Sequence, residues 1–565
     1  MKKTGIIHFF MIIIAATAIC RAEEPTIPFS TGHPADDRPA LPDYLPKKPG
    51  KGLTLPPTRV APDTVAQGQT FELKGVDFEG NTIFSNQDLF ETARDFIGDQ
   101  VNLSDLEEIR YRLTRKYIDQ GYINSGAILK PGQEVDDGVV IYVIMEGRVD
   151  NVNIAGNKRL RRGYIEQRIL PDGDLPFNVF TLQENFQMLL QDPLIQQMNG
   201  RIRPGISPGE AFLDLDIVRA RPYELSLTAD NHRTPSTGAE GVTATGTVWN
   251  LTGSGDRLDA SLGISEGVND VGTRFTMPVN ALGTRLSLGY SQNDNSVIEE
   301  PFSSVDIESE SRNFEINLTH PFLRTLTRNV EAGVTLAARK SQTTLDGADF
   351  SFSKGADNGE SKVTALRLIQ SYVDRTPSMA LSLRSTVSVG LDIFDATIHD
   401  GHRPDGEFLA WLVQTQYARR LGDKLGQVIL RGDLQLADDN LLSLEQFASG
   451  GVNSVRGYRE NQRVRDNGYL VSAEWRYPLW TDKKEGRLQT SLFTDFGSAW
   501  NKGEDTDEDP LHSIGVGLLW KINRFAMAEI YLAHDLEKAA QKYDHNIQDD
   551  GIHFRFTVNF FPKKG

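Results

Sequence analysis

Apolar and polar residues alternate one by one along many stretches between Tyr223 and Phe560. The last of these stretches has Ile552, Phe554, Phe556, Val558 and Phe560 at every second position, with His553, Arg555, Thr557 and Asn559 between them. A period of two predicts β-strands, because successive side chains of a strand point to opposite faces. One face of such a strand suits lipid or a protein core, and the other suits water. This part of the chain is therefore expected to be all-β.

The number and length of the strands distinguish between two all-β folds. Half-buried strands of a soluble sandwich show the same alternation as the wall of a membrane barrel. Residues 222–561 contain sixteen such segments, many of them near the ~9–11 residues that cross a bilayer at a tilt. Short connections such as 252–256 and 421–424 alternate with long ones such as 293–310 and 344–361. The sequence therefore predicts a 16-stranded antiparallel transmembrane β-barrel with periplasmic turns and longer extracellular loops.

Two copies of a mixed α/β pattern precede the barrel. Val152–Asn157 repeats Val76–Asn81 with an offset of 76 residues, and Gly200–Gly205 resembles Gly126–Gly132. The expected elements are a strand at 71–78, helices at 85–97 and 104–120 in the first copy, and helices at 162–169 and 182–191 in the second. The pattern predicts two β-α-α-β-β units in tandem, at 69–148 and 149–221.

The N-terminal residues have the composition of an export signal followed by a linker. Lys2 and Lys3 precede a short apolar core, and Ala22 is a small residue at a suitable cleavage position, which predicts a signal peptide at 1–22. Residues 23–68 carry ten prolines. Because proline fixes φ and lacks a donor, this segment is expected to be a disordered or extended tether.

Composition and motifs exclude several classes of function. Cys20 is the only cysteine, so a mature chain would have neither a disulfide nor a thiolate metal site. A net charge of −17 argues against a nucleic-acid partner. Phosphate-loop, zinc-protease and serine-hydrolase motifs are absent from the sequence, so no catalytic, cofactor-binding or metal-binding residues are predicted. Asp438–Asp439 and the acidic run 504–509 are interpreted as solvated loop residues.

At this point the chain resembles a known family. The two repeats look like POTRA domains, and the whole layout is similar to the transporters of two-partner secretion, the TpsB or hemolysin secretion/activation family. In the first repeat the resemblance rests on Gly121–Ile123, Leu129–Gln133, Asp137–Val140 and Val143–Arg148. In the barrel it rests on Asp230–Asn231, Ser236–Gly238 and Gly253–Asp256, and most specifically on Gly450–Tyr458 and Phe493–Gly497.

The resemblance implies a loop-to-barrel latch. The loop motif Val455, Arg456, Gly457 and Tyr458 would lie at the tip of a loop, 438–468, folded inward between strands eleven and twelve. The barrel-wall motif Phe493, Asp495 and Gly497 would lie on strand thirteen, with Arg456 bound to Asp495. Taken singly, Arg456 could be a solvated loop arginine and Asp495 an ordinary carboxylate of the lumen. Phe560 would be the barrel assembly signal, although the chain continues to Gly565.

The same resemblance implies a function. POTRA domains in the periplasm would bind a secreted, TpsA-like exoprotein in extended form by strand addition, and the barrel in outer-membrane lipid would pass it to the cell surface or medium. The transporter itself would be inserted by the barrel-assembly machinery and would be a monomer. A factor that assembles other barrels and a passive porin are the alternatives. Whether a plug helix precedes the first POTRA domain stays open, because the prolines leave little room for one.

Overall fold

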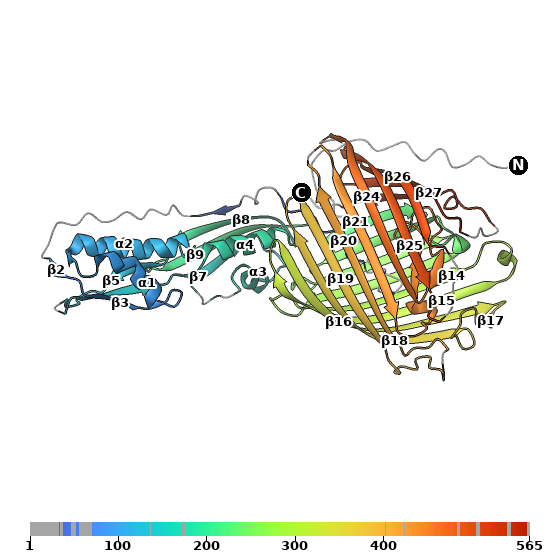
Figure 1. Ribbon diagram of the computed structural model, residues 1–565, viewed down its shortest axis with the longest axis horizontal. Helices are drawn as coiled ribbons and strands as arrows, with labels where there is room; N and C mark the ends of the chain where they lie inside the picture. Colours follow the sequence, from blue (N-terminus) through green and yellow to red (C-terminus); the bar gives the residue numbers. More distant parts are fainter. Residues whose placement is uncertain are drawn as a thin grey trace.

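The computed structural model describes residues 33, 35, 38–46, 52–55, 70–135, 137–171, 173, 176–401, 403–422, 424–482, 486–503, 509–539 and 544–561. The predicted signal peptide at 1–22 and all of the acidic run except Asp509 lie outside the described residues. Two α/β units at one end are followed by a large barrel at the other (Figure 1). None of the helices in the described ranges is long and apolar enough to cross a membrane.

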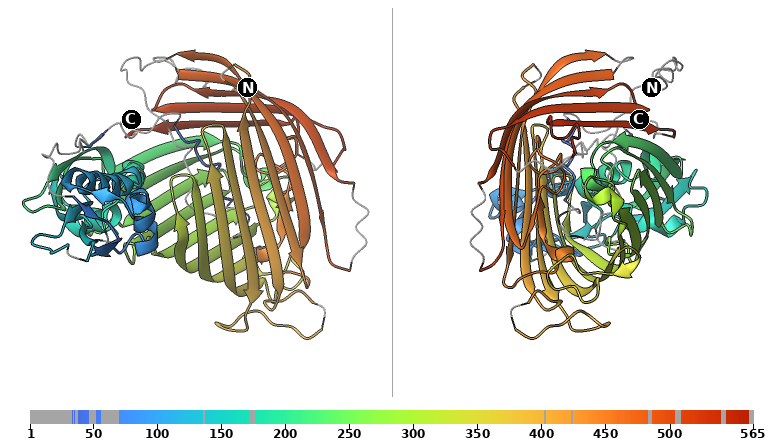
Figure 2. Two further views of the ribbon diagram at one scale, coloured as in Figure 1. Left: turned by 60° about the vertical axis from the view of Figure 1, so that its left-hand side comes forward. Right: turned by 90° about the vertical axis from the view of Figure 1, so that its right-hand side faces the viewer.

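The C-terminal part is a closed antiparallel barrel, in agreement with the predicted sixteen strands. The wall consists of β10 Tyr223–Asp230, β11 Gly241–Trp249, β12 Arg257–Ser265, β13 Val268–Pro278, β14 Arg285–Ser296, β15 Ile307–Arg324, β16 Arg328–Leu345, β18 Glu360–Arg375, β19 Met379–Gly390, β20 Leu409–Arg420, β21 Gln427–Ala437, β24 Asn467–Asp482, β25 Gly486–Trp500, β26 Leu511–Lys521, β27 Ala526–Asp535 and β28 Ile552–Asn559. The two-residue strand β17, Ala348–Asp349, only extends the edge of β16. Figure 2 shows the strands surrounding a lumen, with the α/β units at one mouth.

Several strands are longer than a membrane requires. β15 and β16 have 18 residues each, whereas about 9–11 cross a bilayer. The predicted loop 293–310 is therefore too long, since the ladder between β14 and β15 continues to the pair Ser296–Glu308. Polar side chains continue with it, as Gln292 donates to Glu310 at 3.1 Å. Apolar and polar residues no longer alternate in this part of the sequence, because both faces of the hairpin contact water beyond the membrane.

The barrel closes where its first strand meets its last. β10 and β28 share only five residue pairs, from Ser226–Asn559 to Asp230–Arg555. Asn231 continues the seam with its side chain, which donates to the carbonyl of Ile552 and accepts from the amide of Phe554, both at 2.8 Å. Asn231 is fully buried. Side-chain hydrogen bonds thus complete a ladder that the backbone leaves short.

The first α/β unit has the expected order of elements. They are β2 Phe71–Glu72, β3 Gly75–Glu79, α1 Asn86–Ala93, the short helix Arg94–Phe96, β4 Gln100–Val101, α2 Leu103–Asp119, β5 Gly126–Leu129 and β6 Val139–Met145. The sheet has the order β3-β6-β5. The predicted first strand 71–78 is in fact two, because the buried Leu73 pairs with Asp99 and Gly98 while Lys74 turns to Gly138.

The second unit repeats this order with one additional strand. It contains β7 Arg148–Ala155, α3 Arg162–Ile169, α4 Val179–Leu190, β8 Ile195–Pro204 and β9 Glu210–Arg219. Helix α4 begins three residues before the predicted start, since the side chain of Asn178 caps it by accepting from Phe180 and Thr181. The sheet order is β1-β8-β9-β7. The added edge strand β1, Leu53–Thr54, comes from the proline-rich segment and pairs in parallel with Gly200–Arg201.

The described part of the proline-rich segment is extended, and its location was not predicted. Residues 33, 35 and 38–46 lie along the inside of the barrel wall, toward the mouth nearest the α/β units. His33 bonds to the carbonyl of Glu445 at 3.0 Å, and the amide of Leu45 donates to Thr376 in the turn between β18 and β19 at 3.2 Å. The segment therefore occupies part of the lumen before residues 52–55 reach the second α/β unit.

The second α/β unit rests on turns of the barrel. The amide of Arg161 donates to Gly253 at 3.0 Å, and Asn250 donates to the carbonyl of Arg159 at 2.8 Å. Gly255 has a φ of +85°, and a Cβ atom there would lie 2.3 Å from the ring of Tyr164. Only glycine allows this close approach, which explains the Gly-Ser-Gly sequence of the turn.

Candidate functional site

The loop between β21 and β24, residues 438–466, folds into the lumen. A short helix, Ser443–Glu445, and a two-stranded hairpin of β22 Phe447–Ser449 and β23 Arg463–Arg465 lead to its tip. The loop therefore lies between the eleventh and twelfth strands of the wall, and Asp495 lies on the thirteenth. The tip carries Val455–Tyr458, and all four residues are buried.

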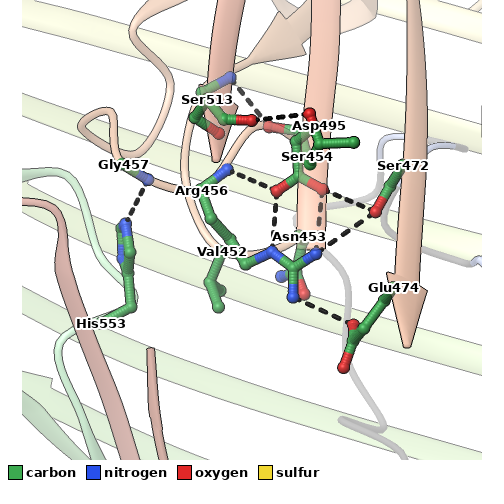
Figure 3. Close-up of polar contacts among 12 residues, drawn as sticks. Val452, Asn453, Ser454, Arg456, Gly457, Ser472, Glu474, Asp495, Ser513 and His553 are labelled. Atoms are coloured by element: carbon green, nitrogen blue, oxygen red, sulfur yellow. Dashed lines mark hydrogen bonds and ion pairs between the residues drawn. The ribbon is translucent and has the colours of Figure 1, made fainter. Parts of the chain in front are cut away.

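The structure brings Arg456 and Asp495 together. The guanidinium donates through Nε to Oδ2 of Asp495 at 2.7 Å and through Nη2 to Oδ1 at 2.9 Å (Figure 3). The backbone amide of Arg456 donates to Oδ2 as well, at 3.1 Å. Such a bidentate pair fixes both the position and the orientation of the loop tip. Arg456 is 2 % exposed and Asp495 is fully buried, so neither charge is solvated.

Neighbouring wall residues complete the surroundings of the guanidinium. Nη1 of Arg456 donates to Glu474 at 3.0 Å, and Ser472 bonds to Asp495 at 2.6 Å. The guanidinium carbon lies 3.5 Å from the ring centre of Phe493, in cation–π geometry. The ring centre of Tyr531 lies 5.0 Å from the same carbon, so the arginine has two carboxylates and two aromatic rings as partners. Removing one member of such a buried set commonly costs about 3–5 kcal/mol.

The other residues of the tip contact β25 again and two further strands, β26 and β28. Val455 packs so closely on Gly497 that a Cβ atom at 497 would lie 2.8 Å from it. The amide of Gly457 donates to Nε2 of His553 on β28 at 3.2 Å. The hydroxyl of Tyr458 lies 2.7 Å from the carbonyl oxygen of Glu537 and accepts from the amide of His512 at 3.1 Å. The tip is therefore bound to a continuous sector of the wall, from β24 to β28.

A second anchor lies near the start of the loop. Oε1 of Glu445 is 2.7 Å from Nη2 of Arg367 on β18 and 2.8 Å from Nη1 of Arg339 on β16. All three side chains are at most 6 % exposed. The loop consequently joins two sectors of the wall that are separated by several strands, and it crosses the lumen between them.

A third anchor joins the loop to the extracellular side. Arg459 donates to both carboxylate oxygens of Asp549, at 2.5 and 2.7 Å, and to Glu299 at 2.5 Å. The hydrogen bonds from Arg459 to Asp549 raise the pKa of this guanidinium above its usual range. Glu299 lies in the connection between β14 and β15, and Asp549 in that between β27 and β28. Two extracellular connections are thus held by the same loop.

Sequence reasoning missed Glu445 as an anchor within the loop, and Glu474 and His553 as partners of the loop on the wall. Each lies at an inward position of its segment, but nothing in a single sequence distinguishes an inward carboxylate that binds an arginine from one that faces water. The predicted assembly residue Phe560 follows β28, with its amide bonded to Leu225 at 2.9 Å. Within the described ranges, no three His, Cys, Asp or Glu side chains are grouped as a metal site would require.

A closed barrel that carries two α/β units at one mouth and an arginine-tipped loop bound inside defines an outer-membrane transporter with periplasmic domains. The sequence profile of the haemolysin secretion/activation proteins ShlB/FhaC/HecB matches residues 209–519, and that of the ShlB-type POTRA domain matches residues 71–147. The first match covers more than half of the chain. The chain belongs to this family, and it is an outer-membrane transporter of two-partner secretion with its POTRA region in the periplasm.

Individual relatives agree in length and fold. The outer membrane transporter CdiB of Dickeya dadantii is 23% identical over 455 residues, which span 78% of this chain and 79% of the relative. The heme/hemopexin transporter protein HuxB of Haemophilus influenzae is also 23% identical, over 76% of each chain. Among solved structures, CdiB from Escherichia coli superposes with a TM-score of 0.69 at 20% identity, covering 89% of this chain and 94% of that one. BamA from Haemophilus ducreyi gives 0.51 at 13% identity, covering 87% and 100%.

Proposed function

We propose that the chain exports one large partner protein, which its two POTRA units bind as an extended segment and which leaves through the lumen when the inward loop moves. The bidentate contact of Arg456 with Asp495 is the observation that carries this proposal. In the structure the loop and residues 33, 35 and 38–46 occupy the lumen, so an extended chain can pass only after they shift. The loop-to-wall contact acts as a latch whose release opens the path.

Strand addition at the POTRA sheets supplies the capture step. An exposed sheet edge binds any extended segment through main-chain hydrogen bonds, without strict demands on sequence. In the second unit the edge strand β8 accepts Leu53–Thr54 of the same chain, which supports the capacity of this edge to take an added strand. We assign residues 69–148 and 149–221 to the two POTRA domains and residues 222–561 to the barrel.

The residues that hold the latch act by position rather than by chemistry. Arg456 and Asp495 form and break an ion pair, and no covalent step is involved. Energy for export then comes from binding in the periplasm and folding outside, which suits a chain without a nucleotide-binding motif. The transporter works as a monomer. Phe560 marks the barrel for the assembly machinery that inserts it into the membrane.

Secretion of a large exoprotein encoded beside this gene tests the proposal. We expect the exoprotein in the medium with the wild-type transporter, its retention with the deletion strain, and reduced secretion with Arg456→Ala. Secretion that is unchanged by the deletion, together with lower amounts of other outer-membrane barrels, would replace this function by barrel assembly. Arg312→Ala is the matched control, because this arginine pairs with Glu310 at an exposed site away from the loop.

A further inference from the structure

The inner face of β20 and β21 holds an extended polypeptide in this structure. The side-chain amide of Gln414 donates to the carbonyl of Ala35 at 3.0 Å, and that of Gln416 donates to the carbonyl of Pro39 at 2.5 Å. Gln414 is fully buried and Gln416 is 6 % exposed. Both contacts are made to main-chain oxygens, so the two glutamines bind an extended backbone whatever its side chains. Side-chain contacts add to them, since Arg38 of the segment pairs with Asp433 on β21.

Below the glutamines the lumen widens into a cavity of about 730 Å³ at the periplasmic mouth. Its lining includes the six basic residues Arg257, Arg375, Arg420, Arg476, Arg487 and Lys521, and the two acidic residues Asp43 and Glu529. The protein as a whole has a net charge of −17. A local excess of basic side chains in so acidic a protein attracts anionic groups to the mouth.

Residues 40–44 of the chain itself line this cavity and show what it accommodates. The guanidinium of Arg420 lies 4.0 Å from the ring centre of Tyr44, whose hydroxyl donates to Gln427 at 3.2 Å. Asp43 lies close enough to Arg375 to interact with it electrostatically. An acidic and an aromatic side chain on an extended backbone therefore match the site, the first by charge and the second by stacking on arginine.

We propose that Gln414, Gln416 and the basic cavity around Arg420 form the path of the exported chain, which enters through an acidic and aromatic segment in extended form. This inference rests on the proposed export function and adds a substrate chemistry and a location to it. The chain's own residues 35 and 38–44 occupy the same path at rest. Backbone recognition by the glutamines lets the rest of the partner follow whatever its sequence.

Cross-linking of a synthetic peptide to the full-length transporter tests the path. The probe is a nine-residue copy of residues 38–46 with Pro39→Cys, supplied as its mixed disulfide with thionitrobenzoate, so that a transporter thiolate forms the new S–S bond and thionitrobenzoate leaves. The only cysteine, Cys20, lies in the predicted signal peptide, so the mature transporter has no thiol of its own. It carries Arg38→Ala and Tyr44→Ala, which remove the contacts of these side chains with Asp433 and Arg420 and so weaken the resident segment. A new thiol is then introduced by Gln416→Cys or, as the matched control, by Asn317→Cys. Asn317 lines a separate cavity of the lumen and bonds to Thr335.

We expect a mixed disulfide at position 416 and at least about fivefold less at position 317. Arg420→Glu in the transporter, or Asp43→Lys in the peptide, should lower the yield at 416 by about tenfold, as the loss of a favourable charge contact does. Equal yields at the two positions, or a yield insensitive to charge, would overturn the proposal. The proposal would also be overturned if inorganic phosphate competed with the peptide for cross-linking at 416 as well as the unlabelled peptide does, since the cavity would then be a general anion site.

This measurement separates the inference from the export function. It uses the purified transporter in detergent or liposomes and does not depend on the partner. If the peptide cross-links preferentially at position 416 but the transporter secretes no partner, the inferred path is supported and the proposed export function is contradicted. Normal secretion together with no preference for position 416 would do the reverse.

Discussion

Glu445 of the inward loop lies 2.7 Å from Arg367 on the barrel wall, at a point remote from the contact between Arg456 and Asp495. The loop is therefore held both near its start and at its tip. Because Glu445 is also bonded to Arg339, Glu445→Gln removes the carboxylate that two buried guanidinium groups share. We expect a loss of about 3–5 kcal/mol in loop docking and more frequent large-conductance openings in planar bilayers. Glu315→Gln is the control, as it removes an ion pair with Arg274 that does not touch the loop; equal channel activity in the two variants would contradict the second anchor.

Arg456→Lys separates charge from geometry at the latch. A lysine retains the positive charge but makes no bidentate contact with Asp495 and no planar stack on Phe493. We expect secretion and channel behaviour close to those of Arg456→Ala. Recovery to wild-type levels with lysine would mean that charge alone holds the tip. Heat-modified migration in gels shows that each variant still forms a barrel.

Gly255→Val tests the contact between the second α/β unit and the barrel. A valine side chain at 255 would overlap with the ring of Tyr164. This steric overlap should destabilise the contact by about 1–3 kcal/mol. We expect faster proteolysis of the POTRA region and lower secretion. Gly422→Val is the matched control. It too has a positive φ, of +116°, but no heavy atom lies within 4 Å of the point that a Cβ atom would occupy there. Equal damage from both variants would assign the effect to backbone strain.

Leu53→Asp tests the added strand at the POTRA sheet. The amide of Gly200 donates to the carbonyl of Gly52 at 2.7 Å, and Leu53 packs against Gly200. Loss of this pairing should speed hydrogen exchange at Gly200 about 3–10-fold, the equivalent of one backbone hydrogen bond. The amide of Gly98, which bonds to Leu73 in the first unit, serves as the reference. Unchanged exchange at Gly200 would show that β1 does not protect this edge.

The first POTRA unit should lose stability in acid through Glu146. Burial opposes ionisation of this carboxyl, but hydrogen bonds from Thr82, Ile83 and Tyr117 outweigh it and lower its pKa below the ordinary 4.5. Because the folded pKa is the lower one, the stabilisation is complete above pH 4.5 and is lost as the pH falls through the folded value. Proteolysis near Thr82 should rise below pH 4.5 in the wild type. At neutral pH, Glu146→Gln should already be cleaved as readily as the wild type is in acid, and its rate of proteolysis should be nearly independent of pH. A rate in that variant that rises in acid as it does in the wild type would contradict the assignment.

The fold was predictable because it depends on local periodicities. Alternation marks the strands of the barrel, and the repeat of Val76–Asn81 at Val152–Asn157 marks the two α/β units. The position of the loop also followed, because the resemblance supplied the motifs and strand counting placed them. Errors arose where local patterns weaken, as at the extracellular ends of β14 and β15 and at Leu73.

The lumen contents were not predictable in the same way. Ala35, Pro39 and Tyr44 belong to a proline-rich stretch whose composition indicates only an extended chain. The position of this stretch against Gln414 and Gln416 depends on contacts between residues nearly 400 positions apart in sequence. The same is true of Glu445, whose arginine partners come from two other strands. Patterns in a single sequence predict secondary structure and the face on which a side chain lies. They do not predict which of the side chains that point into the lumen contact one another.

The narrow seam between β10 and β28 has a consequence for the timing of biogenesis. The first barrel strand leaves the ribosome more than 300 residues before its partner, and Asn231 must wait for Ile552 and Phe554. Until then the growing sheet has two unsatisfied edges, which no hydrocarbon environment tolerates. The chain must therefore stay soluble and open until β28 is available, and the pairing of β28 with β10 then closes the wall into a ring.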